Sequence, residues 1–141
     1  MAQINPYLTF NGNCGEAFLF YKSVFGGDFR EFLKFGDMPP MEGQELTESD
    51  KQKTMHVSFP ISSETILMGS DITSSHPNVV YGQNISLSVN TSTKTEADTL
   101  FNGLAVGGNI TMPLSDTFWG AYFGMLIDKF GIAWMINCDA K

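Results

Sequence analysis

Apolar and polar side chains alternate along this chain in short runs, and the runs have the periods of strands and of amphipathic helices. Residues 4–10 alternate with period two, which predicts a strand with one buried face. Residues 13–25 instead place apolar side chains at helical spacing, and the pair Gly26 and Gly27 ends that pattern. The first half of the chain therefore predicts strand, helix and three more strands, at residues 28–35, 55–61 and 65–71.

The second half repeats this order. Asn13 and Glu16 have the spacing of a helix capping box, and Thr93 and Glu96 repeat it 80 residues later. Strands are predicted around that second helix at residues 84–89, 109–114, 121–128 and 132–138. We therefore predict one α+β domain over residues 1–141, built from two tandem βαβββ modules, 1–72 and 83–141, with a linker at 73–82. Chance likeness between two common motifs is the alternative.

Composition narrows the range of functions. Eight Lys and Arg residues, a net charge of −7 and a pI near 4.6 argue against nucleic-acid binding, which requires clustered basic side chains. The sequence has no apolar stretch of the roughly 18–20 residues that a membrane-spanning helix needs, and its start does not resemble a signal peptide. We expect no membrane partner and a cytoplasmic location.

Two features leave alternatives open. Residues 36–53 carry Glu42, Glu45 and Glu48 without an apolar period, so we predict a long loop that is either a cover over a site or disordered. Cys14 and Cys138 are interpreted as free thiols. The position of Cys14 at a helix start would lower its thiol pKa, so that a reactive thiol is the alternative.

Polar side chains follow one face of the predicted strands. If each helix covers the apolar face, the opposite faces carry rows of hydroxyl, amide and imidazole groups: Asn5, Tyr7, Thr9, His56, Ser58, Asn84, Ser86 and Ser88. Together with nearby rings, such rows are typical of a small-molecule pocket, although they can also be the solvent side of an open sheet. The predicted ligand-binding residues are Tyr7, His56, Ser58, Ser86, Trp119, Tyr122 and Trp134.

His56 is the candidate catalytic residue, because an imidazole can act as a general base near neutral pH. The alternative is a partly buried His56 that is hydrogen-bonded to a neighbouring strand. Asp71 and Asp128 are interpreted as residues that cap turns. Trp119 is interpreted as a stacking wall, or else as part of a hinge at Gly120.

Several long segments resemble one known family. INPYLTFNGNCGEAFLFYKSVFGG, MHVSFPI with LMGSD, GGNITMPLSDTFWGAYFGMLIDKFG and IAWMIN are similar to the PhnB-like branch of the glyoxalase, bleomycin-resistance and dioxygenase proteins, the vicinal oxygen chelate superfamily. The resemblance covers nearly the whole chain. It implies paired βαβββ modules that form a cupped mixed sheet, usually in a homodimer.

The resemblance also implies where a metal would bind. Metal-dependent members carry His, Gln or Glu on strands that here place Pro6 or Tyr7, Ser86 and Met135 at the ligand positions. These are poor ligands for a hard cation, so we expect no cofactor and no metal at the customary site. Some relatives carry a label as ubiquinone-pathway methyltransferases. Since the sequence shows no glycine-rich turn of the kind that cradles a nucleotide-like cofactor, methyl transfer is not expected.

Two hypotheses about function remain. The first is a metal-independent protein that binds or sequesters a small molecule in the cup. The second is an enzyme of the lyase, isomerase or dioxygenase type that uses His56, with or without an atypical divalent metal.

Overall fold

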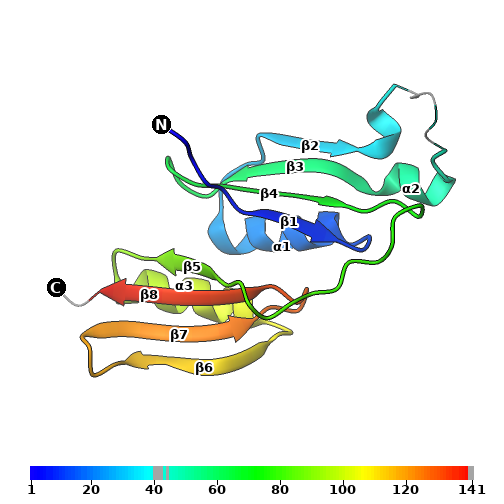
Figure 1. Cartoon of the computed structure of the whole chain (residues 1–141). Helices are drawn as coiled ribbons and strands as arrows, with labels where there is room; N and C mark the ends of the chain where they lie inside the picture. Colours follow the sequence, from blue (N-terminus) through cyan, green and yellow to red (C-terminus); the bar gives the residue numbers. More distant parts are fainter. Residues whose placement is uncertain (40–42, 44, 140–141) are drawn as a thin grey trace. The chain divides into compact units, whose positions relative to one another are not determined.

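A computed structural model describes residues 1–39, 43 and 45–139 of the chain. These residues form two compact units, residues 1–80 and 81–141, of which residues 140 and 141 lie outside the description. Each unit consists of a four-stranded sheet and one long helix. Figure 1 shows the helix of each unit lying against its sheet.

The first unit contains β1 (Tyr7–Phe10), α1 (Cys14–Phe25), β2 (Glu31–Lys34), β3 (Thr54–Pro60) and β4 (Ile66–Asp71). The strand order is β1-β4-β3-β2, in which β1 is parallel to β4 and the other pairs are antiparallel. The parallel pair requires a crossover between β1 and the rest of the sheet, and α1 lies within that crossover.

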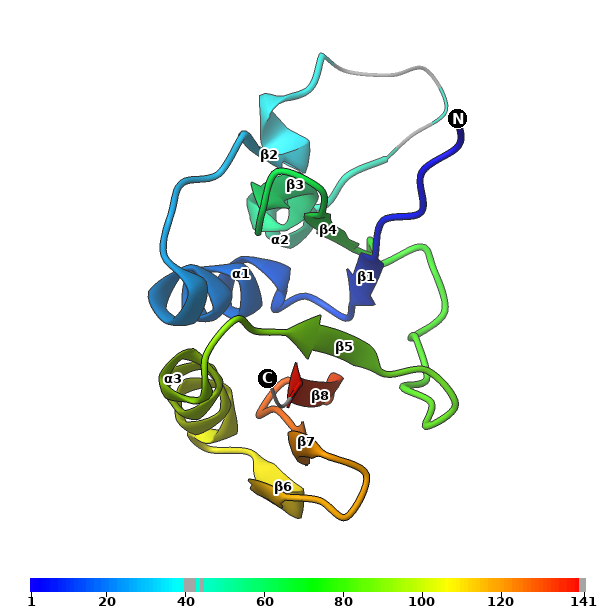
Figure 2. The same ribbon diagram turned by 90° about the vertical axis from the view of Figure 1, so that its left-hand side faces the viewer.

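The second unit repeats this plan. It contains β5 (Leu87–Asn90), α3 (Lys94–Ala105), β6 (Asn109–Asp116), β7 (Ala121–Ile127) and β8 (Ala133–Asp139), in the order β5-β8-β7-β6. Again the first strand is parallel to the last and the other pairs are antiparallel. In the turned view of Figure 2, α3 lies beside the four strands of this unit. The α+β class and the two βαβββ modules predicted from the sequence are confirmed.

Two strands begin later than the alternation predicted. β1 starts at Tyr7 and not at Ile4, whose side chain is 99% exposed, because Asn5 and Pro6 are used to align the chain against β4. The Asn5 side-chain oxygen accepts a hydrogen bond from the Ile66 amide at 3.1 Å, and the Pro6 carbonyl accepts one from the Met68 amide. β5 similarly starts at Leu87, so that Ser86 precedes the strand.

The start of α1 differs from the prediction. Within the described residues, the Asn13 side chain makes no capping hydrogen bond to the helix, so the capping box predicted there is wrong. The Asp71 carboxylate takes that role, because its Oδ1 accepts from the Gly12 amide at 3.0 Å and from the Cys14 amide at 2.9 Å. A carboxylate brought in by β4 is a stronger acceptor for these amides than a neutral amide oxygen.

The start of α3 follows the sequence more closely. The Thr93 hydroxyl accepts a hydrogen bond from the Glu96 amide at 3.1 Å, as a capping threonine does. The Glu96 carboxylate accepts from the Ser92 amide, one residue before the cap. The predicted capping role of Thr93 is therefore confirmed.

Residues 36–53 are not a plain loop. The single-turn 3₁₀ helix η1 (Phe35–Asp37) and the short helix α2 (Glu48–Gln52) lie at its two ends, which corrects the prediction. The Thr47 hydroxyl and the Asp50 carboxylate form a capping box at α2, but a five-residue helix is too short to show an apolar period. Glu42, one of the three acids of the predicted loop, lies outside the described residues.

Asp50 joins α2 to the segment that follows β4. Its carboxylate is buried and accepts hydrogen bonds from the Ser74 hydroxyl at 2.7 Å, from the Ser74 amide at 2.9 Å and from Lys53 at 3.1 Å. These donors, with the Ser74 hydroxyl first, hold the pKa of Asp50 well below its usual range.

We predict that Asp50 contributes to acid sensitivity. Because its pKa is lower in the folded state than the unfolded value of about 3.9, the ionised carboxylate stabilises the fold above that pH, and the contribution is lost as the pH falls below it. In urea unfolding from neutral pH down to about pH 2.5, wild type should therefore lose more stability than Asp50→Asn. Glu48→Gln, which removes an exposed carboxylate of the same helix, is the control and should follow wild type. Parallel curves for wild type and Asp50→Asn would contradict the prediction.

The core of each unit lies between the helix and one face of the sheet. Phe18 of α1 packs onto Gly69, where an added Cβ would lie 2.6 Å from the Phe18 ring. Phe101 of α3 packs in the same way onto Gly124, where a Cβ would lie 2.8 Å from the ring. Both rings are buried, so the glycines let each helix approach its sheet closely and fix which sheet face is covered.

Candidate functional site

The face of the first sheet that points away from α1 carries the polar row expected from the sequence. Phe10, Val57 and Phe59 are fully buried on the helix side of β1 and β3. Since side chains alternate along a strand, Tyr7 and Thr9 of β1, with His56 and Ser58 of β3, belong to the opposite face. We call this face the open face of the first sheet. Glu31 of β2 belongs to it as well, because Glu31 is paired with Ser58.

Tyr7 and His56 meet on the open face. The Tyr7 hydroxyl lies 3.4 Å from His56 Nδ1, and the two rings are stacked with centroids 5.9 Å apart and an interplanar angle of 29°. Their strands are not neighbours, because β4 runs between β1 and β3. The two side chains therefore reach toward each other over β4, and Tyr7 stays 48% exposed.

Glu31 is a third member of this group, and the sequence analysis missed it. Its Oε2 lies 3.9 Å from His56 Nε2, on the side of the imidazole that does not face Tyr7. The pairing of β2 with β3 places Glu31 opposite Ser58, which is 5% exposed. No local signal marks Glu31, because its position beside His56 depends on the register between two strands that are distant in sequence.

The arrangement suits recognition of a hydroxyl or carbonyl group. An imidazole can donate a hydrogen bond at one nitrogen and accept one at the other. A phenol hydroxyl can donate or accept in the same small region. The open face of the first sheet thus offers donors, an acceptor and two stacked rings, with the ring of Tyr7 accessible from solvent.

In the second unit, Ser86 and Trp119 are both accessible. Ser86 is exposed just before β5. Trp119 is 56% exposed in the connection between β6 and β7, where its ring makes edge contacts with Phe118 at 5.1 Å and with Phe123 at 6.1 Å. Gly120 has a φ of 88°, which lets the chain turn directly after Trp119.

Tyr122 and Trp134 lie on the helix side of the second sheet. The Tyr122 hydroxyl donates to Asp98 of α3 at 2.5 Å, and this bond to the protonated phenol raises the pKa of Tyr122. Trp134 is 3% exposed, and its indole N–H donates to Asp128 Oδ2 at 2.8 Å. Strand alternation contained this signal, because Tyr122 shares its face with the buried Leu126 and Trp134 shares its face with the buried Ile136.

The two acids interpreted as turn caps are both buried and both bonded to backbone amides. Asp128 Oδ1 accepts from the Phe130 amide at 2.8 Å and from the Ile132 amide at 3.1 Å, in the turn between β7 and β8. Asp71 caps α1 and also accepts from the Thr54 amide through Oδ2 at 2.9 Å. Each carboxylate therefore ties a turn or a helix start to a second part of its own unit.

Cys14 corrects one sequence-based alternative. The helix start was expected to lower its thiol pKa, but the side chain is fully buried, and burial together with the neighbouring Asp71 carboxylate raises the pKa of Cys14. A buried thiol with a raised pKa is unreactive at neutral pH. Both cysteines are free, which confirms their interpretation as free thiols, and both are buried.

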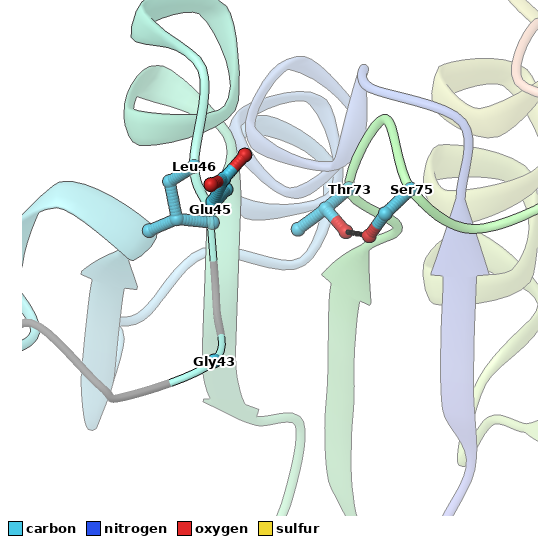
Figure 3. A pocket seen from close by; sticks show the side chains of 5 residues that line it. All are labelled: Gly43, Glu45, Leu46, Thr73 and Ser75. Atoms are coloured by element: carbon cyan, nitrogen blue, oxygen red, sulfur yellow. Dashed lines mark hydrogen bonds between the residues drawn. The ribbon is translucent and has the colours of Figure 1, made fainter.

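Across residues 1–39, 43 and 45–139, no group of three or more His, Cys, Asp or Glu side chains is placed to hold a metal ion. None of the helices in that part of the chain has the length and hydropathy needed to cross a bilayer. A surface pocket of about 450 Å³ in the first unit is lined by Gly43, Glu45, Leu46, Thr73 and Ser75 (Figure 3), none of which is a predicted site residue.

Comparison with known proteins places the chain among characterised folds. A family model described as 3-demethylubiquinone-9 3-methyltransferase matches residues 2–137. Protein YjdN of Escherichia coli (strain K12) is 31% identical over 140 residues, which cover 95% of this chain and 93% of that protein.

Solved structures agree with this placement. The crystal structure of protein PA1353 from Pseudomonas aeruginosa is 44% identical over the full length of both chains, with a TM-score of 0.83. A putative 3-demethylubiquinone-9 3-methyltransferase, the PhnB protein from Bacillus cereus, is 28% identical with a TM-score of 0.77 and covers 97% of this chain and 99% of its own. A glyoxalase/bleomycin resistance protein/dioxygenase family enzyme from Burkholderia phytofirmans PsJN, 17% identical over 98% of this chain and 99% of its own with a TM-score of 0.60, shares the fold.

Proposed function

The chain belongs to the family described as 3-demethylubiquinone-9 3-methyltransferase, the PhnB-like branch with the glyoxalase and bleomycin-resistance fold, and on that premise we propose that it binds or sequesters a small molecule. The proposed site is the open face of the first sheet, where Tyr7, His56 and Glu31 meet. Ser86 and Trp119 are proposed as further ligand-binding residues of the second unit. The homodimer implied by the resemblance stays a prediction, which size-exclusion chromatography with light scattering tests.

One observation carries this proposal. The stacked Tyr7 and His56 rings, with the phenol hydroxyl 3.4 Å from Nδ1, reach over an intervening strand instead of pointing into solvent separately. Polar rings that are held together on an accessible sheet face are a preorganised surface for a flat ligand with a hydroxyl or carbonyl group. We propose an oxygenated ring compound as the ligand class.

The family description names a methyl transfer to a demethylated ubiquinone. From this description we take only the class of substrate and propose that this chain binds a compound of that class. A quinol or quinone is an oxygenated ring and therefore fits the proposed ligand class. The sequence shows no glycine-rich turn of the kind that cradles a nucleotide-like cofactor, so we propose binding without methyl transfer.

We predict that removal of the His56 side chain weakens ligand binding and leaves the fold intact. A panel of benzoquinones, hydroquinones and phenols is screened by thermal shift, and the best probe is titrated by calorimetry. His56→Ala should weaken that probe about tenfold, because one charge-assisted or neutral hydrogen bond and one stacking contact are lost. His76→Ala, the substitution of the other histidine of the chain, is the matched control and should bind like wild type.

Three results would contradict the proposed function. The first is equal binding by His56→Ala and wild type, and the second is an equal loss of binding in His76→Ala. The third is a stoichiometric divalent metal in purified wild type that disappears in His56→Ala. Turnover of S-adenosylmethionine with a demethylated quinol would replace the proposal with methyl transfer.

An enzyme that uses His56 as a general base is the second candidate. The observation that favours it is Glu31, whose carboxylate lies 3.9 Å from Nε2 and would stabilise the imidazolium after His56 accepted a proton at Nδ1. Glu31→Gln separates the two functions. It should lower the turnover rate of an enzyme, because the imidazolium loses its neighbouring carboxylate, but it should leave the affinity of a neutral probe nearly unchanged in a binding protein.

A further inference from the structure

Three methionines stand side by side across the second sheet. The strand register pairs Met112 of β6 with Met125 of β7, and Met125 with Met135 of β8. On the far side of Met135, β5 places Ser88. We call Met112, Met125 and Met135 the methionine row.

The row lies on the face of the second sheet that points away from α3. On β7 and β8 the residues adjacent to Met125 and Met135 are buried against the helix, and side chains alternate along a strand: Gly124, Leu126, Trp134 and Ile136. Met112 is the register partner of Met125, between two register shifts of β6, and we infer that its exposed side chain lies on the same face. Met112 is 42% exposed, and the other two are half-buried, so the thioethers are accessible.

The spacing allows three sulfur atoms to converge. Neighbouring strands lie about 4.8 Å apart, and each methionine has three rotatable bonds before its methyl group. The side chains of Met112 and Met135 can therefore lean toward Met125 from both sides. Three thioethers form a soft donor set that discriminates against hard cations such as Ca²⁺ and Mg²⁺, which prefer oxygen, and favours Cu(I).

The charge of the chain and the burial of its thiols both favour binding of a soft cation at the methionine row. The chain carries a net charge of −7, and the exposed Asp139 ends β8, the strand of Met135, so the field of the chain favours a cation. Asp116, which ends β6, is already paired with Lys94 at 2.9 Å. The two thiols of the chain, Cys14 and Cys138, are buried, and Cys138 shares the helix-facing side of β8 with Ile136. We propose that the methionine row is a binding site for a soft monovalent cation, Cu(I). This site is independent of the proposed function, because it shares no residue with the open face of the first sheet.

The test uses the full-length chain with Ag(I), a redox-stable substitute for Cu(I), and then Cu(I) itself without oxygen. Methionine methyl groups labelled with ¹³C give one NMR signal for each of the eight methionines. Addition of Ag(I) should shift three of these signals and leave the other five in place as internal controls. In parallel, competition with a chromogenic chelator measures how many Cu(I) ions bind and how tightly.

Substitutions assign the signals and the site. Met125→Leu keeps the volume of the central side chain but removes its sulfur, and it should weaken Cu(I) binding about 10- to 100-fold. Met68→Leu, a half-buried methionine of the first sheet, is the control and should bind like wild type. Met112→Leu, on the exposed edge strand, gives the same test if Met125→Leu unfolds.

Each outcome decides the proposal. One ion per chain that shifts the three row signals and is lost in Met125→Leu or Met112→Leu supports it. The proposal is overturned if wild type cannot compete with the chelator, if Met68→Leu weakens binding equally, or if Ag(I) binds without shifting the row signals, as it would at Cys14 or Cys138.

Discussion

Asp71→Ala should lower the free energy of unfolding by about 3–5 kcal/mol, since each buried amide that loses its acceptor costs about 1–3 kcal/mol. The Asp71 carboxylate accepts from the amides of Gly12, Cys14 and Thr54 at 2.9–3.0 Å. These bonds tie the end of β4 to the start of α1 and to the start of β3. Because Asp71 is 4% exposed and the Cys14 and Thr54 residues are buried, water replaces the lost acceptor poorly. Urea unfolding followed by circular dichroism measures the effect.

Asp139→Ala is the matched control for Asp71→Ala. Asp139 ends β8, which holds the place in the second sheet that β4 holds in the first, but its side chain is exposed and accepts only from the Asn137 side chain among the hydrogen bonds described. Its removal should change stability by less than about 0.5 kcal/mol. A loss below about 1 kcal/mol in Asp71→Ala, or equal losses in the two variants, would show that Asp71 does not hold the first unit together.

Asp128→Asn should destabilise the chain by about 2–4 kcal/mol although it changes the side-chain volume very little. Among the hydrogen bonds described, Asp128 accepts from the amides of Phe130 and Ile132 at Oδ1 and from the Trp134 indole at Oδ2. An asparagine has one acceptor oxygen, so its NH₂ group must face either the two amides or the indole, and one side then opposes donor to donor. Thermal and urea unfolding of the same variant measure the loss.

A double-mutant cycle with Trp134→Phe separates the two sides of Asp128. If the indole bond is a substantial part of the effect, the two substitutions together should cost less than the sum of the single losses, with a coupling energy of about 1–2 kcal/mol. Additive losses would place the whole effect of Asp128→Asn in the turn between β7 and β8 and would contradict the role given to the Trp134 bond.

Strand and helix positions follow from local physical chemistry, and this is why they were predictable. The periods of two and 3.6 residues reflect which side of an element is covered, and every main strand and both long helices were predicted. Predictions failed where a distant group replaced a local one. Asp71 caps α1 in place of Asn13, and Asn5 aligns the chain before β1 begins at Tyr7.

The candidate site was predictable in part. Alternation along β1 and β3 placed Tyr7 and His56 on the same side of the first sheet. Alternation along β7 and β8 also indicated that Tyr122 and Trp134 face the helix, because they share their strand faces with buried apolar residues. The partner Glu31 carries no local signal, because only the pairing of β2 with β3 brings it to His56. The methionine row likewise depends on the pairing of three strands.

By itself, the sequence determined the two βαβββ modules, their long helices and the polar face of the first sheet, because side-chain periodicity and turn residues act within a few positions of each other. Only the tertiary structure decided the strand order β1-β4-β3-β2 and β5-β8-β7-β6, the contacts of Asp71, Asp128 and His56, and the alignment of the methionine row. Those features depend on register between strands that are distant in sequence, and register is set by the packing of whole faces and not by any single segment.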